Sequence, residues 1–371
     1  MRLKSHKSLV ITTARVIRAI RHEQRNFTSR KFRRMSVLPS TFNGYDYRSS
    51  FFSQTFAAVA LCLFSGGASM AQDSFPDRPI TIVVPAQPGG SSDVLFRKLA
   101  AEAQAITGNV FIVMNKPGAS ATMGTAFVTQ AKPDGFTLGG VWNGPLTMAP
   151  LMVPVSYTPT SYDPVIQISS APIVMCVRKD FPATNGKEFI AQLRANPDKY
   201  TYGTTDGHGG SIHFGVTRVL KGLDVRARVI PFNSTPATLQ GFLSGSVDIY
   251  TGASAVAIKG SMGSGAAKCL LVSSAQDNAA VPQASGLDAM GVANAATYIW
   301  YGIIAPSATP AAIVAKLESI FQQAAATTSF KEYLQTVGMQ TTLLNARAMR
   351  KIIDEEYVIN SLISKDLKMQ Q

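Results

Sequence analysis

Short runs of β-branched and aliphatic residues alternate along this chain with segments in which apolar residues recur every three or four positions. The first such run is residues 80–84, and after Ser91 and Ser92 the apolar positions repeat with helical spacing to residue 106. This pattern predicts a strand followed by a helix that begins at the two serines. Further strands are predicted at 110–114 and 136–141, with a helix at 122–130.

The same alternation resumes after a Pro-, Ser- and Tyr-rich passage at residues 145–164. The predicted strands are 172–177, 200–203, 229–231, 247–251, 269–273 and 301–305. The predicted helices are 186–195, 211–220, 236–243, 310–324, 329–337 and 346–367. Short apolar strands that alternate with helices are typical of the α/β class, in which helices cover both faces of a mostly parallel sheet.

Two such series predict two lobes, each a mostly parallel sheet flanked by helices. We expect residues 72–171 and 297–371 to form the first lobe and residues 172–296 the second. The two connecting strands would act as a hinge, and hinge closure around a ligand is the expected motion. Because open α/β sheets bind ligands beyond the carboxyl ends of their strands, the ligand site is expected in the cleft between the lobes.

Positive charge is concentrated at the start of the chain. The 371 residues carry a formal net charge of +13, and residues 1–50 account for +10 of it. Residues 51–371 carry the remaining +3 and have no run of Lys and Arg. Binding to a phosphate backbone requires such clustered cations. Nucleic acid is therefore not expected as a partner.

A secretory signal explains the basic start. Residues 51–64 are apolar but too short to span a bilayer, and the small residues Ser69 and Ala71 precede Gln72. This predicts a signal peptide within residues 1–71, cleaved after Ala71, and export to the periplasm. A buried helix is the alternative for the apolar run. The basic stretch is long for a signal peptide, and Met35 is a second candidate start.

Three cysteines are present, and Cys62 lies inside the apolar signal segment. Leu61 precedes it where a lipid-attachment signal requires a small residue. Cys176 and Cys269 would remain after cleavage, both in apolar, strand-like runs. An oxidising compartment permits them to pair, and buried free thiols fit the same pattern, so their state stays open at this point.

A glycine-rich turn follows the first predicted strand, where Pro88, Gly89 and Gly90 lead into Ser91, Ser92 and Asp93. Glycine lets the backbone turn sharply and approach a ligand, and the free N–H groups of a first helical turn attract anions. A carboxylate is the natural guest. An ordinary strand-to-helix turn capped by Ser and Asp accounts for the same residues equally well.

A second turn of this kind lies at residues 202–213. A strand ends there in Thr204 and Thr205, and a Gly-rich stretch leads to Ser211 at a predicted helix start. These hydroxyls stand beside exposed N–H groups. Either turn alone is a weak signal, but one turn from each lobe could hold an anion from two sides.

Catalytic and metal-binding roles have little support. His208 and His213, five residues apart, do not share a helix face and have no neighbouring cluster of Cys, Asp or Glu, so no metal site is expected. We expect His213 to pack in the core or cap its helix. The segment His208-Gly209-Gly210 is similar to the oxyanion-hole loop of esterases, which leaves an exported hydrolase as the alternative function. The chain has no G-x-S-x-G nucleophile elbow.

A series of motifs covers the whole chain after the signal segment and is similar to one family. The motifs are Phe75-Pro76-Asp77-Arg78-Pro79-Ile80, Pro88-Gly89-Gly90-Ser91-Ser92-Asp93, Asn115-Lys116-Pro117-Gly118-Ala119, Lys132-Pro133-Asp134-Gly135-Phe136, Tyr202-Gly203, Gly245-Ser246-Val247-Asp248 and Tyr301-Gly302-Ile303-Ile304-Ala305-Pro306. In this order they resemble the tripartite tricarboxylate transporter solute-binding proteins, also called Bug receptors.

The resemblance implies a type II periplasmic-binding fold that holds a carboxylate through loop N–H groups, hydroxyls and bridging waters, without catalysis or cofactor. The ligand-binding residues it implies are Pro88, Gly89, Gly90 and Asp93 in the first lobe, Thr204, Thr205 and Ser211 in the second, and Asn143, Tyr298 and Trp300 between them. Gln87 and Asn233, which lie in ligand-selecting loops, are expected to bind the ligand as well. It also implies a monomeric receptor that serves uptake through membrane permease subunits, or sensing.

The chain departs from the family pattern in the loops that select the ligand. Ala86-Gln87 replaces an aromatic and a small residue, and Asn233-Ser234 replaces a basic residue and Gly. Loss of that cation argues against a multiply charged ligand such as citrate. It favours a monocarboxylate or an amide-bearing compound.

Overall fold

The computed structural model describes residues 75–232, 234–253 and 255–369. The chain divides into units of residues 1–69 and 70–371, and the described residues belong to the second. The predicted signal segment and its predicted cleavage site lie outside them. Within the described ranges, no helix is long and apolar enough to cross a membrane.

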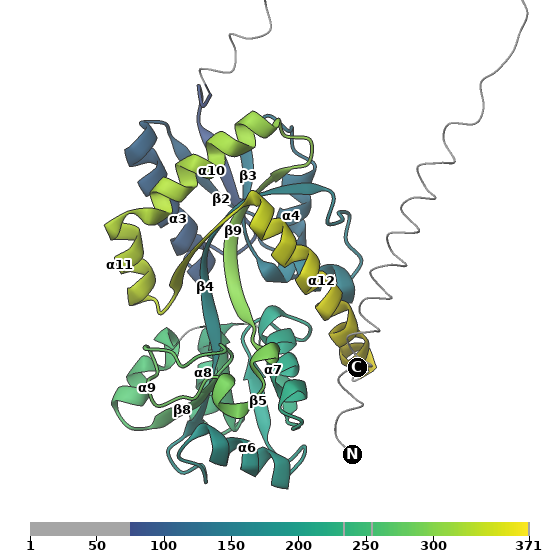
Figure 1. Ribbon diagram of the computed structural model, residues 1–371, viewed down its shortest axis with the longest axis vertical. Helices are drawn as coiled ribbons and strands as arrows, with labels where there is room; N and C mark the ends of the chain where they lie inside the picture. Colours follow the sequence, from purple (N-terminus) through teal and green to yellow (C-terminus); the bar gives the residue numbers. More distant parts are fainter. Residues whose placement is uncertain (1–74, 233, 254, 370–371) are drawn as a thin grey trace, which may run out of the picture. The chain divides into compact units, whose positions relative to one another are not determined.

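The described residues form strands and helices in alternation (Figure 1). The strands are β1 (Ile80–Val84), β2 (Phe111–Asn115), β3 (Thr137–Trp142), β4 (Tyr162–Arg178), β5 (Thr201–Thr204), β6 (Arg228–Pro231), β7 (Ile249–Ala253), β8 (Ala267–Val272), β9 (Tyr298–Pro306) and β10 (Gln340–Asn345). The helices are α3 (Ser91–Thr107), α4 (Thr122–Thr129), α5 (Ala149–Met152), α6 (Gly186–Ala195), α7 (Ser211–Gly222), α8 (Thr235–Leu243), α9 (Lys259–Gly263), α10 (Ala311–Ala326), α11 (Thr328–Thr336) and α12 (Ala346–Met369). Short helical turns are η1 (Ala119–Ala121), η2 (Gly144–Met148), η3 (Val256–Ile258), η4 (Asp288–Met290) and η5 (Ala293–Ala295).

The predicted α/β class is confirmed, but the sheet is mixed rather than mostly parallel. Its order is β2-β1-β3-β9-β4-β7-β5-β6, with β8 and β10 also paired to β4. Neighbours β1 and β2, β1 and β3, β5 and β6, and β5 and β7 run parallel. Every pairing that involves β4 or β9 is antiparallel.

Strand β4 belongs to two groups of strands. Residues 162–172 pair with β9, and part of this stretch also pairs with β10. Residues 173–178 pair instead with β7 and β8. We call β1–β3, β9 and β10 the first strand group and β5–β8 the second. Nearly all of this 17-residue strand is buried, because both of its faces are covered.

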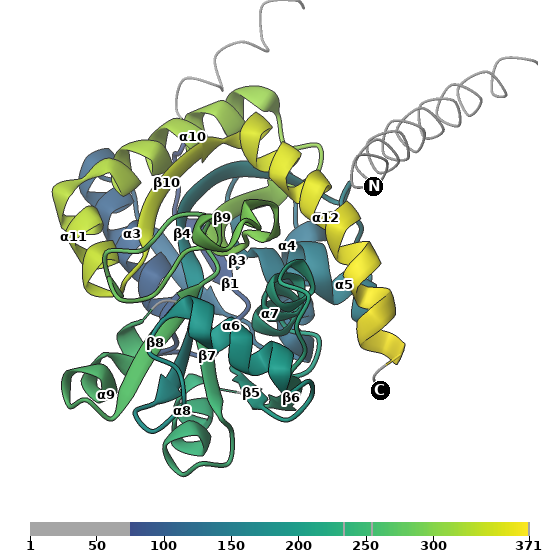
Figure 2. The ribbon, with the colours of Figure 1, turned by 60° about the horizontal axis from the view of Figure 1, so that its bottom comes forward.

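Helices cover the strand groups on several sides. Helices α3 and α10 pack on each other, and α10 and α12 both contact β4. Figure 2 shows α12 running beside α5 and α7, which it contacts. The C-terminal helix therefore packs against elements that follow both β3 and β5 along the chain.

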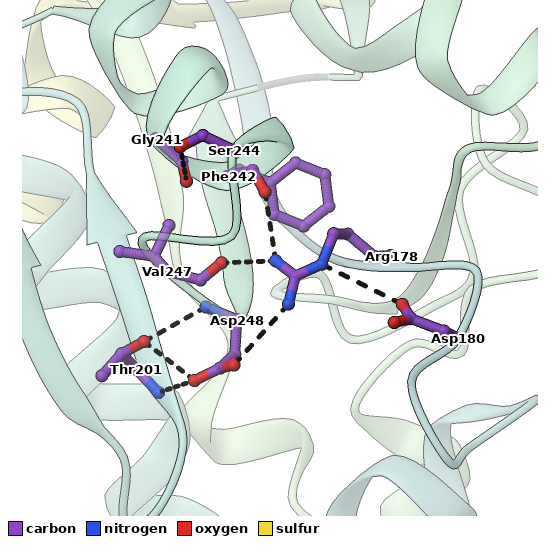
Figure 3. Close-up of polar contacts among 8 residues, drawn as sticks. All are labelled: Arg178, Asp180, Thr201, Gly241, Phe242, Ser244, Val247 and Asp248. Carbon is purple, nitrogen blue, oxygen red and sulfur yellow. Dashed lines mark hydrogen bonds and ion pairs between the residues drawn. The ribbon is translucent and has the colours of Figure 1, made fainter.

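Arg178, at the end of β4, ties the second strand group together (Figure 3). Its guanidinium donates hydrogen bonds to the carbonyls of Phe242 (3.1 Å) and Val247 (2.7 Å). It also lies 3.8 Å from the Asp248 carboxylate, which accepts from the backbone N–H (2.8 Å) and hydroxyl (2.9 Å) of Thr201. One cation thus joins β4 to the connection between α8 and β7 and, through Asp248, to β5.

The structure settles the state of the two buried cysteines. Cys176 on β4 lies opposite Cys269 on β8, and the two form a disulfide bond. Both residues are fully buried, so the bond links β4 to the second strand group out of contact with solvent.

We predict that a tryptic digest without reductant contains Cys176 and Cys269 in one linked species, which reduction splits. Mass spectrometry of the paired digests checks this. Replacing both cysteines with alanine should lower the free energy of unfolding by about 2–4 kcal/mol, because the bond restricts the unfolded chain. Alkylation of either cysteine in the denatured, unreduced protein would contradict the assignment.

Candidate functional site

A cavity of about 420 Å³ lies where both glycine-rich turns meet. The turn between β1 and α3 and the turn between β5 and α7 both line it. Residues of β7, β9 and α11 contribute to the lining as well. The lining residues are Gly89, Ser91, Ser92, Val94, Trp142, Thr205, Asp206, Ser211, Ile212, Thr235, Tyr250, Ala253, Val256, Ala257, Ile299, Tyr301, Tyr333, Val337 and Met339. The cavity therefore collects residues from widely separated parts of the sequence.

The two turns share one local design. Gly89 and Gly209 have φ values of +77° and +75°, which favour glycine because a side chain would be strained there. The next glycine of each turn is extended and precedes the helix, and a serine then begins α3 or α7. Gly-Gly-Ser is thus the same backbone turn in both places.

The third helical residue closes each turn by a hydrogen bond back to its first glycine. The Gly89 N–H donates to Asp93 Oδ2 (2.8 Å), and the Gly209 N–H donates to His213 Nδ1 (3.0 Å). Both bonds span four residues and resemble one half of a capping box. They hold the glycines so that the first turn of each helix is directed at the cavity.

The Asp93 carboxylate bonds to groups of the protein itself. It also accepts from Arg97 Nε (3.0 Å) and from Asn115 Nδ2 (2.8 Å), and it is almost fully buried. Burial alone would raise the pKa of Asp93, but the hydrogen bonds from Arg97, Gly89 and Asn115 outweigh it and hold that pKa below its usual value. Asp93 shapes the first turn and does not line the cavity.

The second turn has an additional acid. Asp206 accepts a hydrogen bond from the Ile212 N–H (3.1 Å) in the first turn of α7, and it lines the cavity. Burial raises the pKa of Asp206 to about 6, against the lowering effect of the Ile212 and Ser211 N–H groups. The amide donors of α7 are therefore already engaged by a carboxylate, whereas those of α3 have no side-chain cap.

The other cavity walls are aromatic and aliphatic. Trp142, Tyr250, Tyr301 and Tyr333 contribute rings, and among the described lining residues none is Lys or Arg. Ser211 is almost fully buried, and its hydroxyl has no hydrogen-bond partner in the described structure. An anion in this cavity would meet backbone N–H groups and hydroxyls rather than a cationic side chain.

The structure brings some of the predicted site residues to the cavity. Gly89, Thr205 and Ser211 line it. Gly90 lies within the first turn, and Gln87 and Pro88 are exposed before it. Thr204 is buried behind the second turn, where its hydroxyl donates to the Gly207 carbonyl (3.1 Å). Asn233 lies outside the described residues.

Asn143, Tyr298 and Trp300 do not line the cavity. Asn143 is fully buried and donates to the Tyr298 carbonyl (2.9 Å). The Trp300 indole N–H donates to the Glu356 carboxylate of α12 (2.9 Å), whose pKa burial raises to about 7. On β9 the residues that reach the cavity are the alternate ones, Ile299 and Tyr301.

Sequence reasoning missed several lining residues for identifiable reasons. The period of a strand separates Ile299 and Tyr301 from Trp300, but the sequence does not say which face is turned to a ligand. Asp206 lies inside the second Gly-rich turn, and an acid so close to a predicted helix start is a signal that the sequence does contain. Tyr250 and Tyr333 have no local signal, since only packing brings them to the cavity.

The architecture is that of periplasmic binding proteins. The solved structure of the periplasmic binding protein BugD superposes with a TM-score of 0.66 at 27% identity, covering 79% of this chain and 99% of BugD. Rpa4515 of R. palustris, solved with adipate, gives a TM-score of 0.68 at 24% identity, covering 79% and 98% of the two chains. A UPF0065 protein of Bordetella pertussis is 29% identical over 313 residues, which is 84% of this chain and 96% of that protein.

The family model "Tripartite tricarboxylate transporter family receptor" matches residues 95–368. The chain belongs to this family of solute-binding receptors, which confirms the resemblance found in the sequence and the expectation that it is not an enzyme. The alternative of an esterase-like hydrolase was wrong. The Gly209 N–H that an oxyanion hole would use instead donates to His213.

We predict that His213 stays neutral, with its proton on Nε2, down to about pH 5. Burial, and then the nearby His208, lower the pKa of His213 to about 4, and its Nδ1 accepts from Gly209. Long-range ¹H–¹⁵N NMR correlations should report this tautomer. Because the unfolded chain takes up the proton near pH 6.5, this group lowers stability by about 2 kcal/mol as the pH falls from 8 to 5.

The variant His213→Asn isolates this effect. Its amide oxygen can still accept from Gly209 but does not titrate, so the wild-type protein should lose more stability than the variant over that pH interval. Urea denaturation at both pH values measures the difference. Equal losses of stability in the two proteins would show that His213 does not have a lowered pKa.

Proposed function

We propose that the chain captures a small carboxylate-bearing solute in this cavity, between two lobes, as an exported receptor for membrane uptake or sensing. The observation that supports it most is the convergence of two matching Gly-Gly-Ser turns, each opening a helix, on one cavity. Exposed N–H groups of a first helical turn and the positive end of the helix dipole favour an anion.

The first turn is the better of the two for the carboxylate. Ser91 and Ser92 line the cavity at the start of α3, where the first N–H groups have no partner within the helix. The second turn has fewer amides to offer, because Asp206 occupies those at the start of α7. The carboxylate would thus be held by N–H groups of α3, with the start of α7 on another wall of the cavity.

The sheet supports a division into two lobes at the predicted boundaries. Strand β4 changes partners between Pro172 and Ile173, and the chain returns through β9, which begins at Tyr298. In this proposal residues 72–171 and 297–371 form one lobe and residues 172–296 the other, with β4 and β9 as the hinge. Closure would be a population shift, driven by tighter ligand binding to the closed state.

Location and partners follow the family. BugD is described as a periplasmic binding protein, and Rpa4515 was solved with adipate, a carboxylate. We propose that residues 1–71 direct this chain to the periplasm, and that its partners there are the solute and membrane permease subunits of a tripartite transporter. The family description supports a membrane partner, and the disulfide suits an oxidising compartment.

We predict that Ser91→Pro weakens carboxylate binding about 10- to 100-fold. Ser91 is the first residue of α3, a position at which proline fits the helix and removes one N–H. Gly90 has an extended backbone, which is the conformation that a residue before proline prefers. A hydrogen bond to a charged group contributes about 1.5–3 kcal/mol. A thermal-shift screen on the protein without residues 1–71 first identifies the organic acids that raise its melting temperature. Calorimetry with those acids then measures the loss of affinity.

The control is Ser91→Ala, which removes the hydroxyl and keeps the N–H. If the N–H binds the carboxylate, the alanine variant should retain most of the affinity that the proline variant loses. Equal affinity of wild type and Ser91→Pro would place the carboxylate elsewhere. A screen in which no organic acid binds would refute the proposed function itself.

A further inference from the structure

Among the described residues that line the cavity, Asp206 is the one with a carboxylate. Asp206 Oδ2 accepts from the Ile212 N–H, but Oδ1 has no hydrogen-bond partner among the described residues and is shielded from solvent. It lies against the backbone of Gly210, where even a Cβ atom would collide with it. A shielded carboxylate oxygen without a donor is destabilising by about 1–3 kcal/mol, which calls for an explanation.

Capping of α7 does not account for this oxygen. One carboxylate oxygen is enough for the Ile212 N–H, and the acid of the first turn, Asp93, has partners for both of its oxygens. Asp206 also lies outside the shared Gly-Gly-Ser design, since His213 already closes the second turn. The shielded oxygen belongs to a carboxylate that lies at the wall of the cavity.

The surroundings show which donor would fit. None of the described lining residues is Lys or Arg, so the protein itself brings no counter-charge into the cavity. Burial raises the pKa of the Tyr301 hydroxyl, and the negative charge of Asp206 raises it further. Tyr301 therefore lies close to Asp206. A second carboxylate on the ligand would be repelled by Asp206, whereas a cationic donor would be attracted.

We propose that Asp206 selects carboxylates that also carry a hydrogen-bond donor, above all a protonated amine. The inference rests on the proposed function, since the carboxylate end of the solute is placed at α3. The cavity then has two unlike ends, with N–H groups of α3 for the anion and Asp206 for the cation. Plain dicarboxylates are disfavoured.

Matched trios of ligands test this by calorimetry on the protein without residues 1–71. Each trio shares one straight carboxylate chain and differs at the far end, which is methyl, ammonium or carboxylate. One example is pentanoate, 4-aminobutanoate and glutarate, and shorter and longer homologues complete the series. We expect the ammonium member of at least one trio to bind about tenfold or more tightly than both others.

Asp206→Asn should remove that preference, because its amide keeps the shape and can still accept from Ile212 but carries no charge. Asp206→Ser repeats the test with a smaller acceptor in case the first variant folds poorly. The matched control is Asp277→Asn, since Asp277 also accepts a backbone N–H, from Gly286 (2.7 Å), and does not line the cavity. That variant should keep the preference of the wild type.

Two results would overturn the inference while the proposed function stands. One is that methyl or dicarboxylate members bind as tightly as the ammonium members in every trio. The other is that Asp206→Asn weakens all three members of a trio equally, as loss of a helix cap alone would do. Absence of binding by every member would instead refute the proposed function, and the inference with it.

Discussion

The rest of the structure depends on β4, one buried strand that must pair with two different sets of neighbours. A strand has two edges, so β4 can hydrogen-bond to β9, β10, β7 and β8 only by changing partners along its length. The change occurs between Pro172 and Ile173, and Arg178 and the disulfide at Cys176 secure the far end. This strand brings the ends of β1 and β5, and the turns that follow them, to one cavity.

The two turns are alike in backbone and unlike in charge. Each uses a glycine at positive φ, an extended glycine and a serine at the helix start, closed by the side chain four residues after the first glycine. That side chain is an ionised, fully paired Asp93 in one turn and a neutral His213 in the other. Asp206 then adds a carboxylate at the cavity wall beside α7, whereas the Asp93 carboxylate beside α3 is paired with Arg97 and does not line the cavity. In our proposals, the same fold element serves as an anion site at one end of the cavity and as a cation site at the other.

The face of β9 turned away from the cavity has a different role. Trp300 and Thr147 both donate to Glu356 of α12, and Asn143 donates to the Tyr298 carbonyl. These bonds hold the C-terminal helix against the return strand and the turn after β3. Ile299 and Tyr301 lie on the opposite face and line the cavity, so one strand contributes to both the cavity and the packing behind it.

The sequence by itself determined what depends on neighbours along the chain. Hydrophobic spacing located most strands and helices, glycine at strained positions marked both turns, and the ordered motifs identified the family. Strand β10 was missed because Gln340–Asn345 is only partly buried and lacks a clear alternation. Only the tertiary structure decided that β4 is shared, that Cys176 meets Cys269, which face of β9 lines the cavity, and that Asp206 lies there while Asp93 does not. Those facts depend on contacts between residues far apart in sequence, which no local pattern encodes.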